Sequence, residues 1–591
     1  MDIPSSKYFS VIKKLHTDFK HRPNELMEKG KNIFPDYNLY YCGPFEERIY
    51  LLLNKENSKG CIFSFERQIT LTNFYNSFYS QIKIDSPYNN HSYLEIDVNL
   101  VEKIVKPDIY LVALYHPENF PLPRFPLGIS DICRAIRQEH CGTIALDDMQ
   151  VGTTLEDILK KIQDKKPDII GISITFGQQD LLESLLESID TAYDERPLIV
   201  VGGSLAALNY EMILNKYPFC IIGTSTGEPT FVDIVKYWRG ELGLNEVRNV
   251  AFIGEIGKII KTGAIKPQHP NEGIPELDLL ENILNCYGVM QLESTRGCSY
   301  ACSFCPRSHK GIWISQSINL LDLLLPEISK IYEKYHHIAK KIFLVDEEFI
   351  GYREESATNE RINSIIEAFY TFGFTFETSA RVDQVYRKNR DGEWHVKRIK
   401  LWKDLNNKVL DRVLFGVESG VDSILKRFNK KTTALQNINA IRVLSACNIP
   451  VRLTYIMFDP LMTFDELLES FHFLGRKDLL LKPLLDVSEE KILNIIHDET
   501  NIHKYLTGKP LYTEITYMLV SLECLIGSSY LKLVEDHGLA GEYKYSMGKR
   551  HAEYVDKRIG FLSYVSQLWI DRNFAVDYTL KSIEKVTKEK L

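Results

Sequence analysis

The sequence predicts an α/β protein with two strand–helix regions, which lie between a mixed α+β segment and a mostly helical end. Short apolar runs alternate with amphipathic stretches from about residue 106 to 240, and again from about 286 to 480. Strands that are apolar throughout are typical of parallel sheets buried on both faces. We therefore expect a doubly wound sheet followed by a complete or partial β/α barrel.

The composition is that of an ordinary globular protein. The 591 residues are 44% apolar and 25% charged, with a formal net charge of −8. A mildly acidic chain without a basic block is a poor nucleic-acid binder, because phosphate contacts require clustered Lys and Arg. No apolar run reaches the ~18 residues of a membrane helix, and the start lacks the apolar core of a signal peptide. We expect a cytoplasmic chain without nucleic-acid or membrane partners.

The order of predicted elements gives the domain boundaries. We expect an α+β region of unknown role at 1–105, the doubly wound domain at 106–240, a proline-containing connector at 241–285, the barrel at 286–480 and a helical region at 481–591. Sheet strands are predicted at 48–54 and 60–66 in the first region, and at 108–115, 142–146, 167–175, 197–203 and 219–223 in the second. Barrel strands are predicted at 289–294, 341–346, 375–380, 412–417 and 451–457, and no sixth strand is clear.

Three of the eleven cysteines differ from the rest in their spacing. Cys298, Cys302 and Cys305 lie within eight residues, directly after the first predicted barrel strand. This Cys-x3-Cys-x2-Cys spacing allows one loop to supply three thiolates to an iron–sulfur cluster, which leaves one iron of a four-iron cluster open. Zinc is the alternative, but structural zinc normally takes four ligands, and only His309 lies close enough in sequence to be the fourth.

The cysteine motif, with Phe304 before the third cysteine, resembles the signature of radical S-adenosylmethionine (SAM) enzymes. In that family the open iron chelates the amino and carboxylate groups of SAM, and the aromatic residue lies near the adenine. The resemblance implies further SAM contacts where successive barrel strands end. The choice within the acidic run 346–348 stays open, because the usual Gly-Gly-Glu form is missing. The implied SAM-binding residues are Phe304, Asp346, Glu348, Glu377, Ser379, Arg381 and Glu418.

The upstream sheet resembles the cobalamin-binding domain of cobalamin-dependent radical SAM enzymes. Small residues at its strand ends would leave a slot for the nucleotide tail of the cofactor. The familiar loop of that domain, Asp-x-His-x-x-Gly, binds cobalt through its histidine, whereas Met149 stands at that place here. We therefore expect cobalamin to bind without a histidine on cobalt. The implied cobalamin-binding residues are Asp147, Met149, Gly152, Ser173, Gly202, Gly203, Gly223 and Glu228.

These resemblances imply an enzyme with three cofactors: a 4Fe-4S cluster, SAM and cobalamin. We expect a C-methyltransferase, in which a 5′-deoxyadenosyl radical takes hydrogen from an unactivated substrate carbon and methylcobalamin then provides a methyl group. A cyclisation or ring rearrangement would use the same motifs. A non-catalytic cobalamin sensor or carrier and a tRNA methylthiotransferase are further alternatives, although the latter would need a second cysteine set and a basic region. The expected partners are a small-molecule or peptide substrate and a flavodoxin- or ferredoxin-type electron donor.

Overall fold

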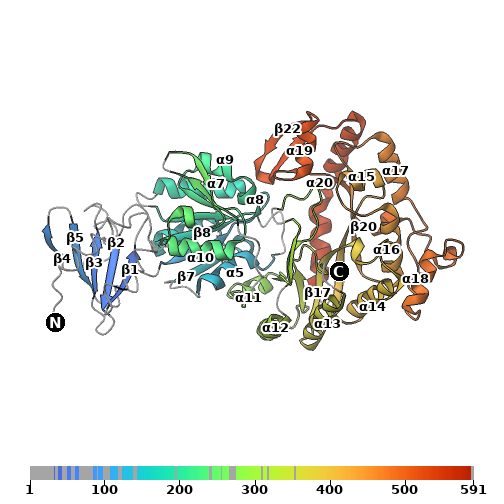
Figure 1. Ribbon diagram of the computed structural model, residues 1–591, viewed down its shortest axis with the longest axis horizontal. Helices are drawn as coiled ribbons and strands as arrows, with labels where there is room; N and C mark the ends of the chain where they lie inside the picture. The colour runs from blue at the N-terminus through green and yellow to red at the C-terminus, as the bar shows by residue number, and fades with distance from the viewer. Residues whose placement is uncertain are drawn as a thin grey trace.

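The computed structural model describes residues 107–116, 123–137, 143–192, 196–238, 242–254, 256–264, 274–307, 310–315, 318–351 and 355–586, and in the first 106 residues it describes the strands β1–β5. Three regions follow one another along the long axis of Figure 1: an N-terminal sheet, a doubly wound domain and a barrel. The predicted α/β class and its order of domains are confirmed.

The N-terminal region is a five-stranded antiparallel sheet in the order β1-β2-β3-β5-β4. Its strands are β1 (Tyr37–Cys42), β2 (Ile49–Asn54), β3 (Gly60–Ser64), β4 (Ile84–Tyr88) and β5 (His91–Ile96). The two strands predicted from the sequence are β2 and β3.

The second region is a seven-stranded sheet in the order β12-β11-β10-β9-β8-β6-β7. Its five parallel strands, all predicted, are β6 (Ile109–Ala113), β7 (Ile144–Asp148), β8 (Ile169–Ser173), β9 (Leu198–Gly202) and β10 (Cys220–Gly223), and the antiparallel strands β11 (Val250–Ile253) and β12 (Ile259–Lys261) extend it. Alternate strand residues enter two separate apolar cores. One core lies under α5 (Leu127–Arg137) and α10 (Gly227–Trp238); the other lies under α6 (Leu155–Lys165), α7 (Gln179–Ala192), α8 (Ser204–Leu208) and α9 (Tyr210–Lys216).

The third region is a partial barrel of six parallel strands in the order β13-β16-β17-β18-β19-β20. The strands are β13 (Met290–Leu292), β16 (Lys341–Leu344), β17 (Thr375–Arg381), β18 (Leu410–Glu418), β19 (Val451–Phe458) and β20 (Ile515–Ser521). Strand β20 is the sixth strand that was not clear from the sequence, and it lies beyond residue 480. Helices surround the strands in Figure 1; they include α12 (Ile318–Tyr332), α13 (Glu355–Thr371), α14 (Gly392–Lys408), α16 (Ala434–Ala446), α17 (Phe464–Leu474) and α18 (Glu489–His497).

The chain after β20 forms a small three-stranded sheet and two helices. The sheet has the order β21-β23-β22, with strands β21 (Cys524–Leu525), β22 (Ala540–Lys544) and β23 (Lys549–Ala552). The helices are α19 (Ser529–Asp536) and α20 (Lys557–Val586). Figure 1 shows α19 and β22 beside α8, where the doubly wound domain meets the barrel.

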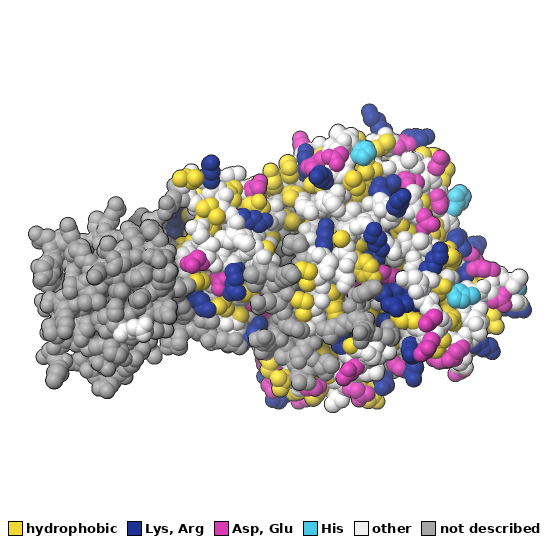
Figure 2. Space-filling model, viewed as in Figure 1, with side chains coloured by type: hydrophobic (Ala, Val, Ile, Leu, Met, Phe, Trp, Pro, Cys, Tyr) yellow, Lys and Arg dark blue, Asp and Glu magenta, His cyan; other side chains and the backbone are white. Residues whose placement is uncertain are grey.

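None of the described helices combines the length and the apolar character that crossing a bilayer requires. On the face shown in Figure 2, basic and acidic side chains of the described residues are interspersed rather than gathered by sign.

Candidate functional site

The three cysteines lie on a loop that a short hairpin closes. Strand β14 (Thr295–Cys298) ends at the first cysteine and pairs antiparallel with β15 (Ile312–Ser315). Gly297 has φ +86°, a left-handed conformation that other residues rarely adopt, immediately before Cys298. The loop returns where the Gly311 N–H donates to the Cys298 carbonyl at 2.9 Å. The cysteine loop, residues 298–311, is thus held at both ends.

Ser303, between the second and third cysteines, anchors the middle of this loop. Its N–H donates to the Phe428 carbonyl at 2.8 Å, and its hydroxyl donates to the Arg427 carbonyl at 2.9 Å. Its own carbonyl accepts from the Tyr530 N–H at 2.8 Å. Segments more than a hundred residues away therefore fix the loop that carries the cysteines.

Arg381, an expected SAM contact, lies against the cysteine loop. Its Nη1 donates to Cys302 Sγ at 3.4 Å, its Nε donates to Asp383 at 2.9 Å, and its guanidinium carbon lies 3.5 Å from the centre of the Tyr300 ring. Its Nη2 donates to the carbonyl of Lys430. Its described partners make Arg381 a support of the cysteine loop, and a direct contact with SAM stays a prediction.

The thiols suit a cluster better than a single ion. Burial raises the pKa of Cys298 to about 12 and also raises the pKa of Cys305, so a metal must displace these protons. No three His, Cys, Asp or Glu side chains surround a single ion site among the residues with described positions. Thiolates that bind different irons of one cluster stand farther apart than ligands around one zinc. His309, the possible fourth zinc ligand, lies outside the described residues.

The three acidic residues 346–348, which follow β16, have different contacts. Asp346 is buried, and its Oδ1 accepts from the N–H groups of Ser294 and Thr295 at 2.7 and 2.9 Å. Glu347 pairs with Arg307 of the cysteine loop. Asp346 therefore holds the turn between β13 and β14, and its carboxylate has little capacity left for a ligand.

Glu348 has an unused oxygen in a buried position. Its side chain is fully buried, and Oε2 has no hydrogen-bond partner. Burial is the main cause that raises its pKa to about 7; the charge of Asp383 also acts to raise the pKa, whereas Arg381 acts to lower it. An unpaired buried carboxyl oxygen is unfavourable, and an N–H of the SAM amino group would satisfy it. Trp313 fixes the backbone here by donating from Nε1 to the Glu348 carbonyl at 2.7 Å.

Glu418 and Lys430 form a buried ion pair beside Phe304. Glu418 has φ +64°, which is strained for a residue other than glycine. Its carboxylate accepts from Lys430 Nζ at 3.1 Å and from the Thr454 hydroxyl at 3.0 Å. Lys430 Nζ lies 6.0 Å from the centre of the Phe304 ring, and the ring of Phe304 meets Phe428 edge to face. Lys430 was not identified from the sequence, because only the fold brings it to this strand end.

Glu377 and Ser379 face the interior of the barrel. Phe376 packs against Phe369 of the outer helix α13, so the alternate positions of β17 point inward. Glu377 accepts from Arg412 Nη2 of the neighbouring strand at 2.6 Å. Ser379 is half-buried on the same face, one step closer to the cysteine loop.

Three expected cobalamin residues form one row on the doubly wound sheet. Ser173, Gly202 and Gly223 end the adjacent strands β8, β9 and β10. By the alternation of the strands, they lie on the same face of the sheet as the core under α5 and α10. A Cβ on Gly202 would meet nothing within 4 Å, and a Cβ on Gly223 would lie 3.8 Å from the Gly202 Cα. The open space beside these small residues would accept the nucleotide tail of cobalamin, and that placement stays a prediction.

At the end of β7, Met149 lies on the other face of the sheet, whereas Val151 of the same loop packs against the core of the barrel. Asp147 accepts from the Tyr110 hydroxyl and from Lys161 Nζ, both at 2.6 Å. Met149 is buried in the core under α6 to α9. Gly152 ends this turn with φ +97°. The structure therefore does not bring Asp147, Met149 and Gly152 together with the row of small residues.

Gly203 and Glu228 have structural tasks next to that row. Gly203 has φ +97°, and a Cβ there would lie 2.1 Å from the Ile174 carbonyl oxygen. Glu228, in the first turn of α10, accepts from Arg296 Nη2 at 2.8 Å, and Arg296 also donates to Glu293 at 2.6 Å. Glu228 therefore links the doubly wound domain to the strand that carries Cys298.

His116 is a further candidate that the sequence did not single out. It follows β6. The next strand along the chain, β7, pairs with one side of β6, and the strand after it, β8, pairs with the other side. Positions where the strand order reverses in this way are the usual ligand sites of doubly wound sheets. Its Nε2 lies 3.0 Å from Asp180 Oδ1.

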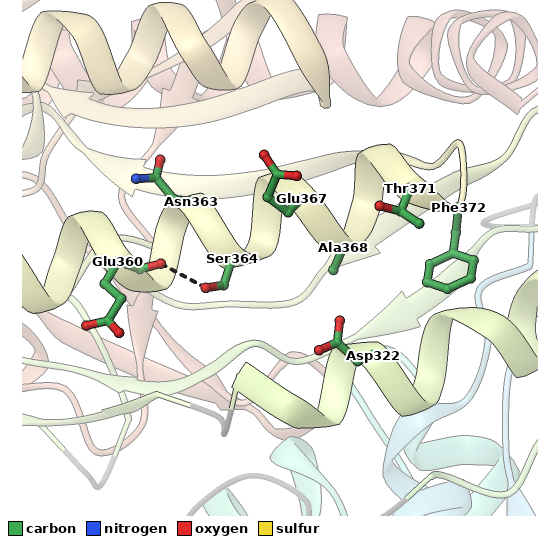
Figure 3. A pocket seen from close by; sticks show the side chains of 8 residues that line it. All are labelled: Asp322, Glu360, Asn363, Ser364, Glu367, Ala368, Thr371 and Phe372. Carbon is green, nitrogen blue, oxygen red and sulfur yellow. Dashed lines mark hydrogen bonds between the residues drawn. The ribbon is translucent and has the colours of Figure 1, made fainter.

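A separate cavity of about 730 Å³ lies between α12 and α13, on the outside of the barrel. Figure 3 shows that acidic and small side chains of these two helices line it. None of the residues expected to bind a cofactor lines it, so it is not the site described above.

Comparisons with known proteins agree with both cofactor regions. A model of the radical SAM superfamily matches residues 292–474, and a model of the B12 binding domain matches residues 119–235. The 4′-phospho-dehydrooxetanocin synthase of Priestia megaterium is 34% identical over 616 positions, which cover 98% of this chain and 81% of the relative. The solved cobalamin-dependent SAM radical enzyme OxsB, with aqua-cobalamin and SAM bound, is 33% identical, with a TM-score of 0.77 over 100% of this chain and 84% of OxsB. An uncharacterized methyltransferase of Pyrococcus horikoshii is 23% identical over 60% of this chain and 74% of its own length.

Replacing Cys298, Cys302 and Cys305 together with alanine should remove nearly all iron from the reconstituted protein. The parent should hold about four irons, because one loop supplies the three thiolates of one cluster. Cys447→Ala, which alters a buried core cysteine, is the control and should retain the iron. About eight irons per parent chain would contradict a single cluster.

Glu348→Gln should weaken SAM binding roughly ten- to hundredfold, because it removes a charge-assisted contact. Binding to the parent should strengthen between about pH 6 and 8, since the carboxyl group accepts best from the SAM amino N–H after it has lost its proton, and the variant should lose this dependence. Calorimetric titration with SAM measures both. The neighbouring Asp346→Asn is the matched variant: it should lower the melting temperature and the iron content instead. A pH-independent affinity in the parent would contradict the role of Glu348.

Gly202→Trp should abolish cobalamin binding by filling the slot, whereas Met149→Ala should leave the affinity nearly unchanged. Absorption titrations measure both effects. The spectrum of bound cobalt(II) should lack nitrogen hyperfine splitting from an axial ligand. Splitting that disappears in His116→Ala would instead place that imidazole on cobalt.

Proposed function

Because this chain belongs to the cobalamin-dependent radical SAM enzymes, we propose that it forms or rearranges a ring in a phosphorylated small molecule. Its cofactors are a 4Fe-4S cluster, SAM and cobalamin. The proposal rests on the 34% identity, along 98% of the chain, to a 4′-phospho-dehydrooxetanocin synthase. That name describes a phosphorylated and dehydrogenated product that contains an oxetane ring.

We favour ring chemistry, which the sequence analysis gave as the alternative, over the methyl transfer that it expected first. The relative named as a methyltransferase is 23% identical and aligns with 60% of this chain, so its support is weaker. Both chemistries use the same three cofactors, and the motifs alone do not separate them. The similarity to the synthase also includes the N-terminal and C-terminal regions of this chain.

When bound, the cluster supplies an electron for the cleavage of SAM, and cobalamin supplies a cobalt centre beside the substrate. We assign the N–H groups of the SAM amino group to Glu348, because its Oε2 is buried without a partner. Lys430, held by Glu418 at 3.1 Å, would face the SAM carboxylate, and Phe304 would lie against the adenine. A buried site of this kind also keeps water away from reactive species.

The remaining barrel residues have supporting roles in this proposal. Arg381 would act through Cys302, since it donates to Cys302 Sγ and is held in place by Asp383 and by the Lys430 carbonyl. Glu377 and Ser379 would border the space between SAM and substrate from the inner face of β17. Enzymes of this class need an external reductant, and we propose a flavodoxin- or ferredoxin-type donor.

The mass of the product tests the proposed reaction. The reconstituted enzyme would be incubated with SAM, a chemical reductant and a panel of phosphorylated sugars and nucleotides, with their unphosphorylated forms as controls. We expect a product that has lost hydrogen and gained no carbon, formed from a phosphorylated compound alone. A product heavier by one methylene group would contradict ring chemistry and favour methyl transfer.

A further inference from the structure

The region after β20 contacts the surroundings of both cofactors. We call residues 524–552, which contain β21, α19, β22 and β23, the C-terminal module. We propose that this module is a positioning element, which fixes the doubly wound domain relative to the cysteine loop. The role does not depend on whether the enzyme performs ring chemistry or methyl transfer.

One side of the module holds the cysteine loop. The Tyr530 N–H and the Ser529 hydroxyl, in the first turn of α19, both donate to the Ser303 carbonyl, at 2.8 and 3.2 Å. The Tyr530 ring is fully buried and meets Phe428 edge to face, and its hydroxyl donates to the buried Asp459. The start of α19 therefore cannot shift without disturbing the segment between Cys302 and Cys305.

The opposite side of the module holds the doubly wound domain. The turn 545–548 accepts two hydrogen bonds there: the Gly177 N–H donates to the Ser546 carbonyl, and Asn209 Nδ2 donates to the Tyr545 carbonyl, each at 2.6 Å. Gly177 follows β8, and Asn209 follows the short helix after β9. The turn is therefore bound to the segments that follow the two strands ending in Ser173 and Gly202.

Gly548 brings this turn into close contact with the domain. It has φ +58°, and a Cβ there would lie 2.9 Å from the Phe176 ring and 3.1 Å from a methyl group of Leu208. Gly538, in the same module, has φ +67°, but a Cβ on it would meet nothing within 4 Å. Both glycines thus have a left-handed backbone that would strain a substituted residue, and they differ in their contact with the domain.

Internal contacts make the module one unit. Arg550 of β23 donates from Nη1 to Glu535 of α19 and from Nη2 to the Gly541 carbonyl of β22, both at 2.8 Å. A displacement of the turn 545–548 is therefore transmitted toward α19. A movement of the doubly wound domain away from the cysteine loop must break these contacts.

The matched variants Gly548→Val and Gly538→Val test the proposal in the full-length, reconstituted protein. In Gly548→Val we expect about tenfold weaker cobalamin binding by absorption titration, because the turn can no longer pack on the domain. Amide hydrogen exchange should accelerate in residues 174–178 and 204–209, while the iron content stays that of the parent. More 5′-deoxyadenosine should form per product molecule. Gly538→Val should match the parent in all four measurements.

Phe176→Ala provides a second test if Gly548→Val does not fold. It removes the ring from the other side of the contact and should change affinity and exchange in the same direction. Parental affinity and exchange in the variants at this contact would overturn the proposal. An equal loss in Gly538→Val would also overturn it, because the effect would then reflect general destabilisation of the module.

Discussion

A cluster bound by one short loop and a cobalamin bound by a separate domain can act on the same substrate only if the two domains keep a fixed separation. Two backbone hydrogen bonds connect the domains. The Phe125 N–H donates to the Val289 carbonyl at 2.9 Å, and the Val289 N–H donates to the Pro123 carbonyl at 3.1 Å. Phe125 belongs to the apolar core of the barrel although it precedes α5. The linkage between the domains is thus part of the barrel edge itself.

Charge reinforces this linkage close to the first cysteine. Arg296 lies between Glu228 of α10 and Glu293, which follows β13. Burial, followed by the charge of Glu228, raises the pKa of the nearby Asp131 to about 8, so this carboxyl group stays mostly protonated at neutral pH. Arg296 itself donates to the carboxylates of Glu228 and Glu293, and pairing of this kind offsets part of the cost of burying charged groups.

Local patterns allowed much of the fold, and the metal-binding part of the site, to be predicted from the sequence. Apolar runs identified the parallel strands, and a cluster motif on one loop needs no knowledge of tertiary structure. Strand β20 was missed because it follows a long stretch of loops and short helices. Lys430 and Tyr530 reach the cysteine loop through the fold alone. The alternation of side chains along the strands could have shown that Gly202 faces the same side of the sheet as Val200, and that Met149 lies on the opposite side.

The central claim is that both cofactors serve one substrate held between the two domains. The most direct measurement follows deuterium from a labelled, phosphorylated substrate into 5′-deoxyadenosine and follows product formation, with and without cobalamin, in cluster-loaded protein. If both cofactors serve one substrate, we expect deuterium transfer and product to appear together. We also expect product to require cobalamin, and neither to appear without the three cysteines. Product formed at an undiminished rate in cobalamin-free protein would contradict the claim.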